Sequence, residues 1–335
     1  MSRLQRRLHL TQVLERPTVD PGQRLVENAL RGRTARKIRN ELRRGVPVVL
    51  HTPRWSQAHH FLEDVSLDLA VGEPGILCRT VSLRPAMGLP LQEVWPLVLR
   101  AFAQTGSRHW VSGPSAAVMD SGGFKTLLAQ ILTEAEGNAL QPVALLAHGA
   151  DGLPVGVLED IAEVWTAHER LFAGERHAGL LLAGAAGTTL VAPPSAARLD
   201  LSDYGEEEAV AAILQRGGPF PNRALRSLAR FTGGIPSLVD AVGECMAQGE
   251  TPPLDPDALL QSLGQLADEL RGAVDIACTD EQLAERIHAL RRGETLLEDP
   301  EIDGPLLEAG LVRRCRGPGG ARVELRAPAI AALVA

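Results

Sequence analysis

The sequence predicts an α/β protein: a parallel sheet covered by helices on both faces, followed by helices and a small C-terminal hairpin. Short apolar runs alternate with stretches of amphipathic helical spacing over residues 21–201. Helical spacing dominates after residue 202, and a glycine-rich turn separates two short strand-like stretches near the C-terminus. Apolar strands that alternate with amphipathic helices are typical of parallel sheets, because both sheet faces are then buried.

The α/β part begins with a helix over 25–44 that ends at Gly45, since glycine commonly follows a helix C-terminus. Apolar runs predict strands at 47–51, 75–83, 142–147, 179–184 and 197–201. Amphipathic spacing predicts helices at 56–72, 91–104, 124–137 and 155–174. Pro96 lies inside the second of these helices and is expected to interrupt or kink it.

The second part of the chain is predicted to be mainly helical. Asp203 and Glu206 form a candidate capping box for a helix over 206–217. Further helices are expected at 224–234, 236–249, 259–272 and 280–293, followed by a short apolar element at 306–312. A hairpin over 313–325 completes a pattern that resembles a winged helix.

Breaks in the pattern divide the chain into four parts. Asp20-Pro21-Gly22 interrupts the chain near the N-terminus, and the proline-rich segment 251–257 separates the later helices. We therefore expect a basic N-terminal arm over 1–20, an α/β core over 21–201, a helical region over 202–256 and a winged-helix domain over 257–335.

Composition bounds the class of protein. Hydrophobic residues make up 45% of the chain and charged residues 22%, which is ordinary for a soluble globular protein. No apolar run approaches the roughly 20 residues that span a bilayer. The 4 cysteines are scattered, without the spacing of a metal site or a disulfide framework. We expect a cytoplasmic protein with no membrane partner.

Charge is distributed unevenly along the chain. The formal net charge is −7, yet residues 1–44 contain 12 Lys/Arg against 4 Asp/Glu. A basic segment can contact nucleic acid or an acidic partner, or it can simply form a solvated helix face. The solvated face is the commoner explanation, and the sequence leaves the alternatives open.

The segment after the first strand carries the most specific motif. It begins with Thr52-Pro53-Arg54 and places Phe61 at its apolar end. This arrangement resembles the loop T-P-R-x-x-G-K-S-S-L of P-loop ATPases of the AAA+ and STAND type, and the bacterial AAA-like branch in particular. In that alignment Gln57, Ala58 and His59 replace the glycine, the lysine and the Ser/Thr, respectively. The resemblance covers roughly residues 21–335 and implies a three-layer P-loop core, an α-helical lid and a winged helix.

These replacements have a chemical meaning if the alignment holds. A working loop needs glycine so that backbone N–H groups can wrap the phosphates, a lysine for the β- and γ-phosphates, and a hydroxyl for Mg²⁺. Ala58 has no charge, and Gln57 lacks the backbone freedom of glycine. His59 is a poor ligand for a hard, oxygen-seeking cation. The resemblance therefore implies a P-loop fold whose phosphate chemistry is lost.

A second motif points the same way. The stretch LLAHGADGLP over 145–154 resembles the Walker B strand end of the family, L-L-I-D-E-A-D-x-L-P. His148 replaces the aspartate that holds Mg²⁺, Gly149 replaces the glutamate that activates water, and Asp151 keeps the later acidic position. In the helical region, Gly234-Ile235-Pro236 matches the G-x-P turn that approaches the nucleotide in STAND proteins. A helix stop and restart would explain the same turn without any nucleotide.

The alignment also places two histidines together. His59 and His148 both stand where side chains would serve Mg²⁺, so we expect them to be neighbours. Imidazoles favour zinc, copper or nickel, which makes a repurposed metal site one hypothesis. Two ligands are too few for a closed zinc site, and polar filling of an empty nucleotide cleft is the alternative. Trp55 would fill space in the same cleft or offer a stacking surface.

Arginines crowd the predicted wing. They are Arg313, Arg314, Arg316, Arg322 and Arg326. Such residues can bind DNA phosphates while a preceding helix enters the major groove. The segment just before the wing, 298–310, is acidic and would repel a phosphate backbone. A wing that docks on a protein is therefore preferred to one that binds DNA.

The function expected from these observations is interaction. We expect a scaffold, adaptor or regulatory subunit with the ATPase shape and no hydrolysis, no cofactor, and a protein partner such as an active ATPase or a regulatory complex. Three alternatives remain: a DNA-binding regulator that uses the wing and the N-terminal arm, a protein that binds ATP or ADP without hydrolysing it, and an ATPase that uses unfamiliar residues.

Overall fold

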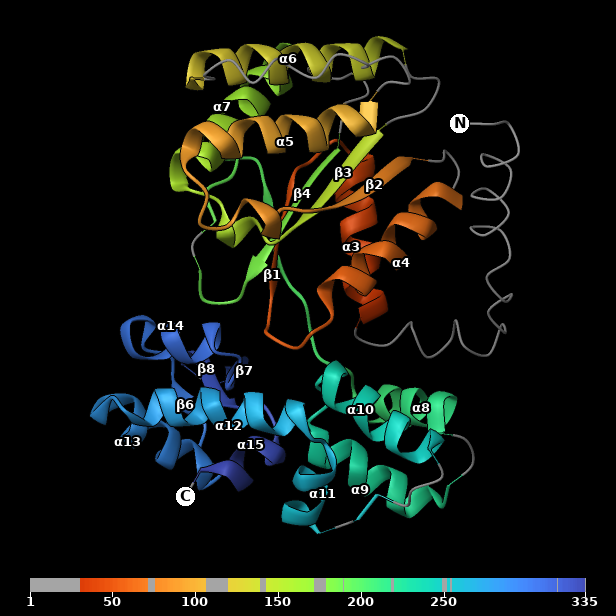
Figure 1. Cartoon of the computed structure of the whole chain (residues 1–335), viewed down its shortest axis with the longest axis vertical. Helices are drawn as coiled ribbons and strands as arrows, with labels where there is room; N and C mark the ends of the chain where they lie inside the picture. Colours follow the sequence, from red (N-terminus) through yellow and green to blue (C-terminus); the bar gives the residue numbers. More distant parts are fainter. Residues whose placement is uncertain are drawn as a thin grey trace.

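The computed structural model describes residues 31–71, 76–106, 120–138, 143–171, 179–188, 190–217, 220–248, 252–253, 255–317 and 319–334. The arm predicted over 1–20 lies outside these residues. The described chain forms an α/β core that is joined, through the segment after its last strand, to a second body of helices and short strands (Figure 1). No helix in these ranges is long and apolar enough to cross a membrane.

The core contains a five-stranded parallel sheet with the strand order β2-β3-β4-β1-β5. Its strands are β1 (Val48–Thr52), β2 (Leu77–Ser82), β3 (Val143–His148), β4 (Gly179–Ala185) and β5 (Ala197–Asp200). The register pairs Leu146 with Leu181 and Leu50 with Ala183. The carboxyl ends of β3, β4 and β1 therefore meet at one edge of the sheet, where ligands bind in open α/β folds.

Helices cover both faces of this sheet, as the continuous apolar strands predict. The helices α3 (Arg31–Arg43) and α4 (Ala58–Val71) pack on one face, and α5 (Leu91–Gly106), α6 (Ser121–Asn138) and α7 (Val155–Leu171) on the other (Figure 1). Alternate strand residues point to opposite faces, so Leu50 joins the cluster around Ile38 while Val49 joins the cluster around Trp165. Pro96 lies inside α5. Short 3-10 turns, Arg84–Ala86 and Ala150–Gly152, follow β2 and β3.

The lid follows the core as α8 (Glu206–Gly217), α9 (Asn222–Thr232) and α10 (Pro236–Ala247). The capping box predicted for α8 is wrong, because the Asp203 carboxylate is buried and paired with Arg326. Glu208 takes up the N-terminal backbone instead: its side chain accepts a hydrogen bond from the N–H of Gly205, 2.6 Å away. A carboxylate at this third position is the other half of a capping box.

The C-terminal part contains four helices before a β-hairpin and one helix after it. They are α11 (Pro256–Ser262), α12 (Gln265–Cys278), α13 (Glu281–Arg291), α14 (Pro300–Glu308) and α15 (Pro328–Leu333). The strands β6 (Leu296–Leu297), β7 (Val312–Gly317) and β8 (Gly320–Leu325) form an antiparallel sheet in the order β6-β8-β7, consistent with a winged helix. The single helix predicted over 259–272 is divided at Gly264, whose φ is +53°.

One apolar cluster spans the lid and the C-terminal part. Leu238 and Val242 of α10 belong to the same cluster as Leu270 of α12 and Val323 of β8. These two parts are therefore packed as one unit, and the α/β core is packed around clusters of its own. Among the described residues, the α/β core and this unit share no buried apolar cluster. Other contacts must therefore hold them together.

Candidate functional site

The loop between β1 and α4 has an unusual backbone. Trp55 and Gln57 have φ values of 61° and 53°, and they are the two non-glycine residues with positive φ in the described part of the chain. This left-handed conformation costs a residue with a side chain roughly 1–2 kcal/mol. Gln57 thus takes up a glycine-like conformation at the position where the resemblance expects glycine. Such a strained backbone conformation persists only where surrounding contacts stabilise it.

Three consecutive carbonyl groups of this loop are bound by other parts of the chain. The guanidinium of Arg326 donates to the carbonyl of Arg54, and the guanidinium of Arg31 donates to that of Ser56. Ser237 binds the carbonyl of Trp55 through both its backbone N–H, at 3.2 Å, and its Oγ, at 3.0 Å. The donors come from α3, the lid and the C-terminal part, so the loop is the place where all three meet.

Trp55 adds an apolar anchor to these hydrogen bonds. Its side chain packs against the cluster shared by the lid and the C-terminal part. Its Nε1 lies 3.4 Å from a carboxylate oxygen of Glu269, and the Arg54 guanidinium stacks 4.8 Å from its ring centroid. Gly310 approaches the loop closely, since a Cβ there would lie 2.8 Å from the Cβ of Arg54. The loop is therefore packed against protein on the side of the wing.

Arg326 is the centre of the contact between the core and the C-terminal part. It is fully buried and forms a two-point ion pair with Asp203, with Nε–Oδ2 and Nη2–Oδ1 distances of 2.8 and 2.6 Å. It also lies 3.4 Å from the carbonyl oxygen of Gly310. The sequence grouped Arg326 with the surface arginines of the wing, and this is wrong, because its side chain is interior and fully engaged.

Of the other wing arginines, three are exposed and Arg322 is half-buried. Arg313 pairs with Glu324 at 2.7 Å and Arg314 with Glu298 at 2.8 Å. Arg322 donates to the carbonyl of Thr295 at 3.0 Å, and Arg316 is exposed. Local carboxylates therefore neutralise two of the four cations that the hairpin presents.

The helix that precedes the wing is packed against the core. A Cβ on Gly187, in the turn after β4, would lie 2.7 Å from the carbonyl oxygen of Gly304 and 3.0 Å from the backbone nitrogen of Glu308. Both of these belong to α14. The helix before the wing is the one that would enter the groove of a DNA duplex, and here α14 is packed against the α/β core of its own chain.

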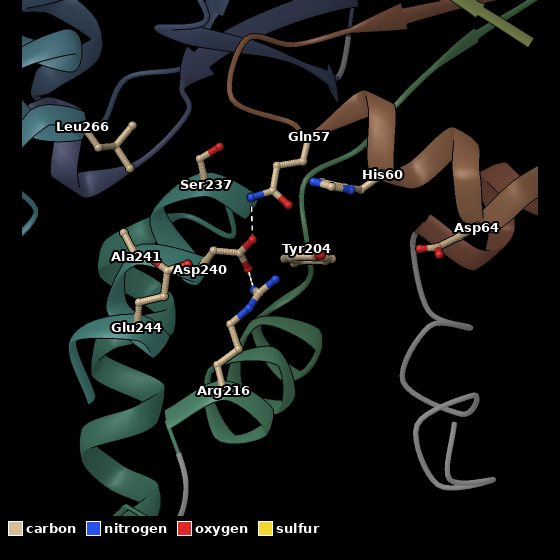
Figure 2. A pocket seen from close by; sticks show the side chains of 10 residues that line it. All are labelled: Gln57, His60, Asp64, Tyr204, Arg216, Ser237, Asp240, Ala241, Glu244 and Leu266. Carbon is tan, nitrogen blue, oxygen red and sulfur yellow. Dashed lines mark hydrogen bonds and ion pairs between the residues drawn. The ribbon is translucent and has the colours of Figure 1, made fainter. Parts of the chain in front are cut away.

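A polar bridge also joins the core to the lid. The Gln57 amide donates to the carboxylate of Asp240 on α10, and Arg216 of α8 forms an ion pair with the same carboxylate (Figure 2). This bridge borders a cavity of about 540 Å³ between α4 and the lid helices (Figure 2). Three carboxylates line the cavity, from Asp64, Asp240 and Glu244.

The expected neighbourhood of the two histidines is confirmed. The ring centroids of His59 and His148 lie 4.8 Å apart, with the planes inclined at 51°. His59 Nε2 is also 3.4 Å from a carboxylate oxygen of Glu63. Over the described ranges of the chain, no group of three or more His, Cys, Asp or Glu side chains is arranged to hold a metal ion. The metal site remains a hypothesis that rests on two imidazoles.

His148 is held neutral by its surroundings. Its side chain is buried, and Nε2 has no hydrogen-bond partner. Burial above all, and then the neighbouring His59 and Arg84, lower its pKa to about 4. The imidazole is therefore uncharged at neutral pH and brings no negative charge to the position where the resemblance expects an aspartate.

The remaining positions of the two motifs lie at the same sheet edge. Thr52 Oγ1 donates to the carbonyl of Gly184 at 2.9 Å, Pro53 follows it, and Ala58 opens α4. Gly149 has a φ of +78°, and a Cβ there would lie 2.9 Å from Arg84 Cγ, so the position leaves little room for a side chain. Asp151 is exposed next to β4.

The lid turn meets the chain just before α8. The backbone N–H of Tyr204 donates to the carbonyl of Gly234 at 2.9 Å, and Pro236 begins α10. A Cβ on Gly234 would lie 2.0 Å from the Tyr204 carbonyl oxygen, so the turn has no space for a side chain. Glycine is required here by close approach to protein.

These residues do not fit a magnesium nucleotide. At the positions that the resemblance gives to an ammonium, a hydroxyl and an aspartate, the chain has Ala58, His59 and the neutral imidazole of His148. A helix N-terminus attracts anions, but Gln57, at the start of α4, is bonded to the Asp240 carboxylate. A phosphate at this point would meet no lysine, and the nearby Arg216 is already paired with Asp240.

Comparisons with known proteins place the fold. No family model and no curated protein matches the sequence. A Walker-type ATPase of Pyrococcus abyssi superposes with a TM-score of 0.58 at 11% identity, covering 91% of this chain and 95% of that one. A STAND protein with a tetratricopeptide repeat sensor from Pyrococcus horikoshii gives 0.45 at 10% identity, and the match covers 91% of this chain but 42% of that one. The RuvB Holliday junction branch migration motor of Thermotoga maritima gives 0.44 at 14% identity, covering 88% and 90%.

The chain therefore has the fold of the Walker-type ATPase of Pyrococcus abyssi. At 11% identity the likeness to the Pyrococcus abyssi protein is one of fold, and it carries no catalytic residue over to this chain.

We predict that Arg326→Met is strongly destabilising. It leaves the Asp203 carboxylate buried without a partner, which typically costs about 3–5 kcal/mol of unfolding free energy. The matched control is Arg313→Met, which removes an exposed ion pair and should cost about 1 kcal/mol or less. Urea unfolding followed by circular dichroism measures both. Equal losses of unfolding free energy in the two variants would contradict a central role for Arg326. The double variant Asp203→Leu/Arg326→Met should regain part of the stability that Arg326→Met loses, because no buried charge is then left unpaired.

We predict that His148 makes the protein acid-sensitive. The pKa of its folded state, about 4, lies below that of an unfolded histidine, near 6.5. Stability is therefore fully present above about pH 6.5 and falls as the pH drops toward about 4, with a slope of at most ~1.4 kcal/mol per pH unit from this group.

Urea unfolding across this pH range measures the slope, which should be shallower in His148→Asn than in the wild type. The pH dependence of His51→Asn is compared with that of His148→Asn, because burial lowers the pKa of His51 as well. Superimposable pH curves for His148→Asn and the wild type would exclude the assignment.

Proposed function

We propose that this protein is a non-catalytic scaffold, adaptor or regulatory subunit that retains the AAA+/STAND-type fold and acts by contact with a protein partner. The observation that carries the proposal is the binding of three consecutive loop carbonyls by Arg326, Ser237 and Arg31. In this chain, side chains fix the loop that a nucleotide organises in working relatives. The result is a closed arrangement of core, lid and winged helix that needs no ligand.

The electrostatics of the cleft support the loss of hydrolysis. Catalysis of phosphoryl transfer depends on positioned cations around the phosphates. Ala58 and His148 supply no charge there at neutral pH, and the nearby Arg216 is already paired with Asp240. We therefore propose a protein that does not turn over ATP and needs no cofactor for its work.

A fixed arrangement of core, lid and winged helix would present a constant binding surface to a protein partner. Arg326 joins the winged helix to Asp203, in the connection between core and lid, and to the loop carbonyl of Arg54. The Gln57–Asp240–Arg216 bridge joins the core to the lid. A partner would thus meet one fixed surface made from all three parts. We propose an active ATPase or a regulatory complex as the partner, because such assemblies use this fold.

The cavity between α4 and the lid favours a second candidate, nucleotide binding without hydrolysis. Its volume of about 540 Å³ is sufficient for a small ligand, and Tyr204 lines it. The carboxylates of Asp64 and Glu244 at its walls oppose a polyphosphate, which is why we place this function second.

We predict that neither ATP nor ADP binds with measurable heat at millimolar concentration in the presence of Mg²⁺. Isothermal titration calorimetry tests this, with Gln57→Gly/Ala58→Lys/His59→Thr as the comparison variant that carries a Gly-Lys-Thr sequence. Phosphate release is measured in parallel. Turnover by the wild type that His59→Ala/His148→Ala abolishes would overturn the proposal, and binding without turnover would establish the second candidate.

We predict a stoichiometric protein partner. A tagged copy is recovered from its native host with and without nuclease, and the partner is identified by mass spectrometry. The purified partner is then assayed alone and with this protein, and its own activity or assembly state should change on addition. Recovery that is lost after nuclease treatment, or a partner whose properties do not respond, would contradict the adaptor proposal.

A further inference from the structure

One face of α3 presents a row of cations to solvent. The residues of α3 that are buried against the core recur at helical spacing: Arg31, Thr34, Ile38 and Leu42. The exposed charged residues along the remainder of α3 and the position after it are all basic. They are Arg33, Arg36, Lys37, Arg43 and Arg44. The opposite face is fixed to the sheet, so the row is held on a rigid element.

The spacing of this row suits a repeating anion. Arg33 and Lys37 are four residues apart, and Arg36 and Arg43 are seven apart, which places each pair on the same side of the helix. Seven residues of α-helix rise about 10.5 Å. A nucleic-acid duplex carries about one negative charge per 1.7 Å of axis, so several phosphates fall within reach of such a row.

Carboxylates within the chain neutralise only part of the row. Arg44 pairs with Glu41 at 3.2 Å, and Arg39, at the side of this face, pairs with Asp68 of α4 at 2.9 Å. Arg33, Lys37 and Arg43 make no ion pair with any residue that the structure describes. This differs from the wing, where Arg313 and Arg314 each have a carboxylate partner.

We propose that this face of α3 binds the phosphate backbone of duplex nucleic acid without reading its sequence. Apart from its cations, the only exposed side chain of α3 is Asn40, so the row offers no aromatic or large aliphatic residue. Protein interfaces usually depend on such anchors at their centre, whereas phosphate binding requires only positioned cations. Guanidinium groups supply most of these and can bind phosphate through two N–H groups at once.

The proposal moves the nucleic-acid contact from the wing to α3, and it goes beyond the scaffold function. The net charge of the whole protein is negative, so a duplex would approach in the orientation that this basic face allows. Binding here leaves the wing, the lid and the cleft unchanged. The outcome is thus independent of the nucleotide titration.

The experiment is fluorescence anisotropy of a labelled random-sequence duplex of about 25 base pairs, titrated with the full chain over a range of salt concentrations. We expect Arg33→Gln/Lys37→Gln/Arg43→Gln to bind at least about tenfold more weakly than the wild type at low salt. The slope of log K against log salt should fall in magnitude by about 2.7, which corresponds to three lost phosphate contacts. All three side chains are exposed, so the fold should be retained, and circular dichroism checks this.

The matched control carries the same change in charge on the wing, Arg313→Gln/Arg314→Gln/Arg316→Gln, and should bind within about twofold of the wild type. Undiminished binding by the α3 variant, an equal loss in the wing variant, or no binding by the wild type at low salt would each overturn the proposal. Phosphatidylserine vesicles form a separate arm: retention on vesicles without binding to the duplex would assign the face to a lipid surface and refute the nucleic-acid assignment.

Discussion

The arrangement of the whole molecule depends on one buried ion pair, between Arg326 and Asp203. Asp203 lies in the short connection from the core to the lid, and Arg326 directly follows the second strand of the wing hairpin. A buried pair of this kind is costly to desolvate, and it is tolerated where both charges are fully satisfied. Here the remaining donor capacity of the guanidinium is used on the carbonyls of Arg54 and Gly310. The pair thus specifies one position of the wing relative to the loop.

The loop between β1 and α4 then keeps a shape for which its own residues are poorly suited. Trp55 and Gln57 occupy left-handed conformations without the freedom of glycine, and hydrogen bonds from three directions compensate. Arg326, Ser237 and Arg31 bind three consecutive carbonyl groups of this loop. The charges of the cleft agree with this, since Ala58 and the neutral His148 supply no cation for a phosphate.

Much of the fold could be predicted from sequence, because local patterns determine it. The apolar runs marked the strands of the sheet to within a residue or two, and the neighbouring positions of His59 and His148 followed from two motifs at one sheet edge. The role of Arg326 could not be predicted in the same way. Alternation along the hairpin places it beside Arg322 and Glu324, but β8 ends at Leu325, and the side chain after the strand turns inward. Long-range partners, such as Asp240 for Gln57, leave no local signal.

The packing of the lid with the winged helix has a mechanical consequence. Because one apolar cluster holds these two parts together, the described chain is divided into two bodies joined by the few residues between β5 and α8. Asp203 lies within this connection, where a hinge between the two bodies would be, and its carboxylate is held by the Arg326 guanidinium. A force applied at the wing would therefore rotate the lid and the winged helix together as one rigid body. This rotation relative to the core would require the Arg326–Asp203 ion pair to break first.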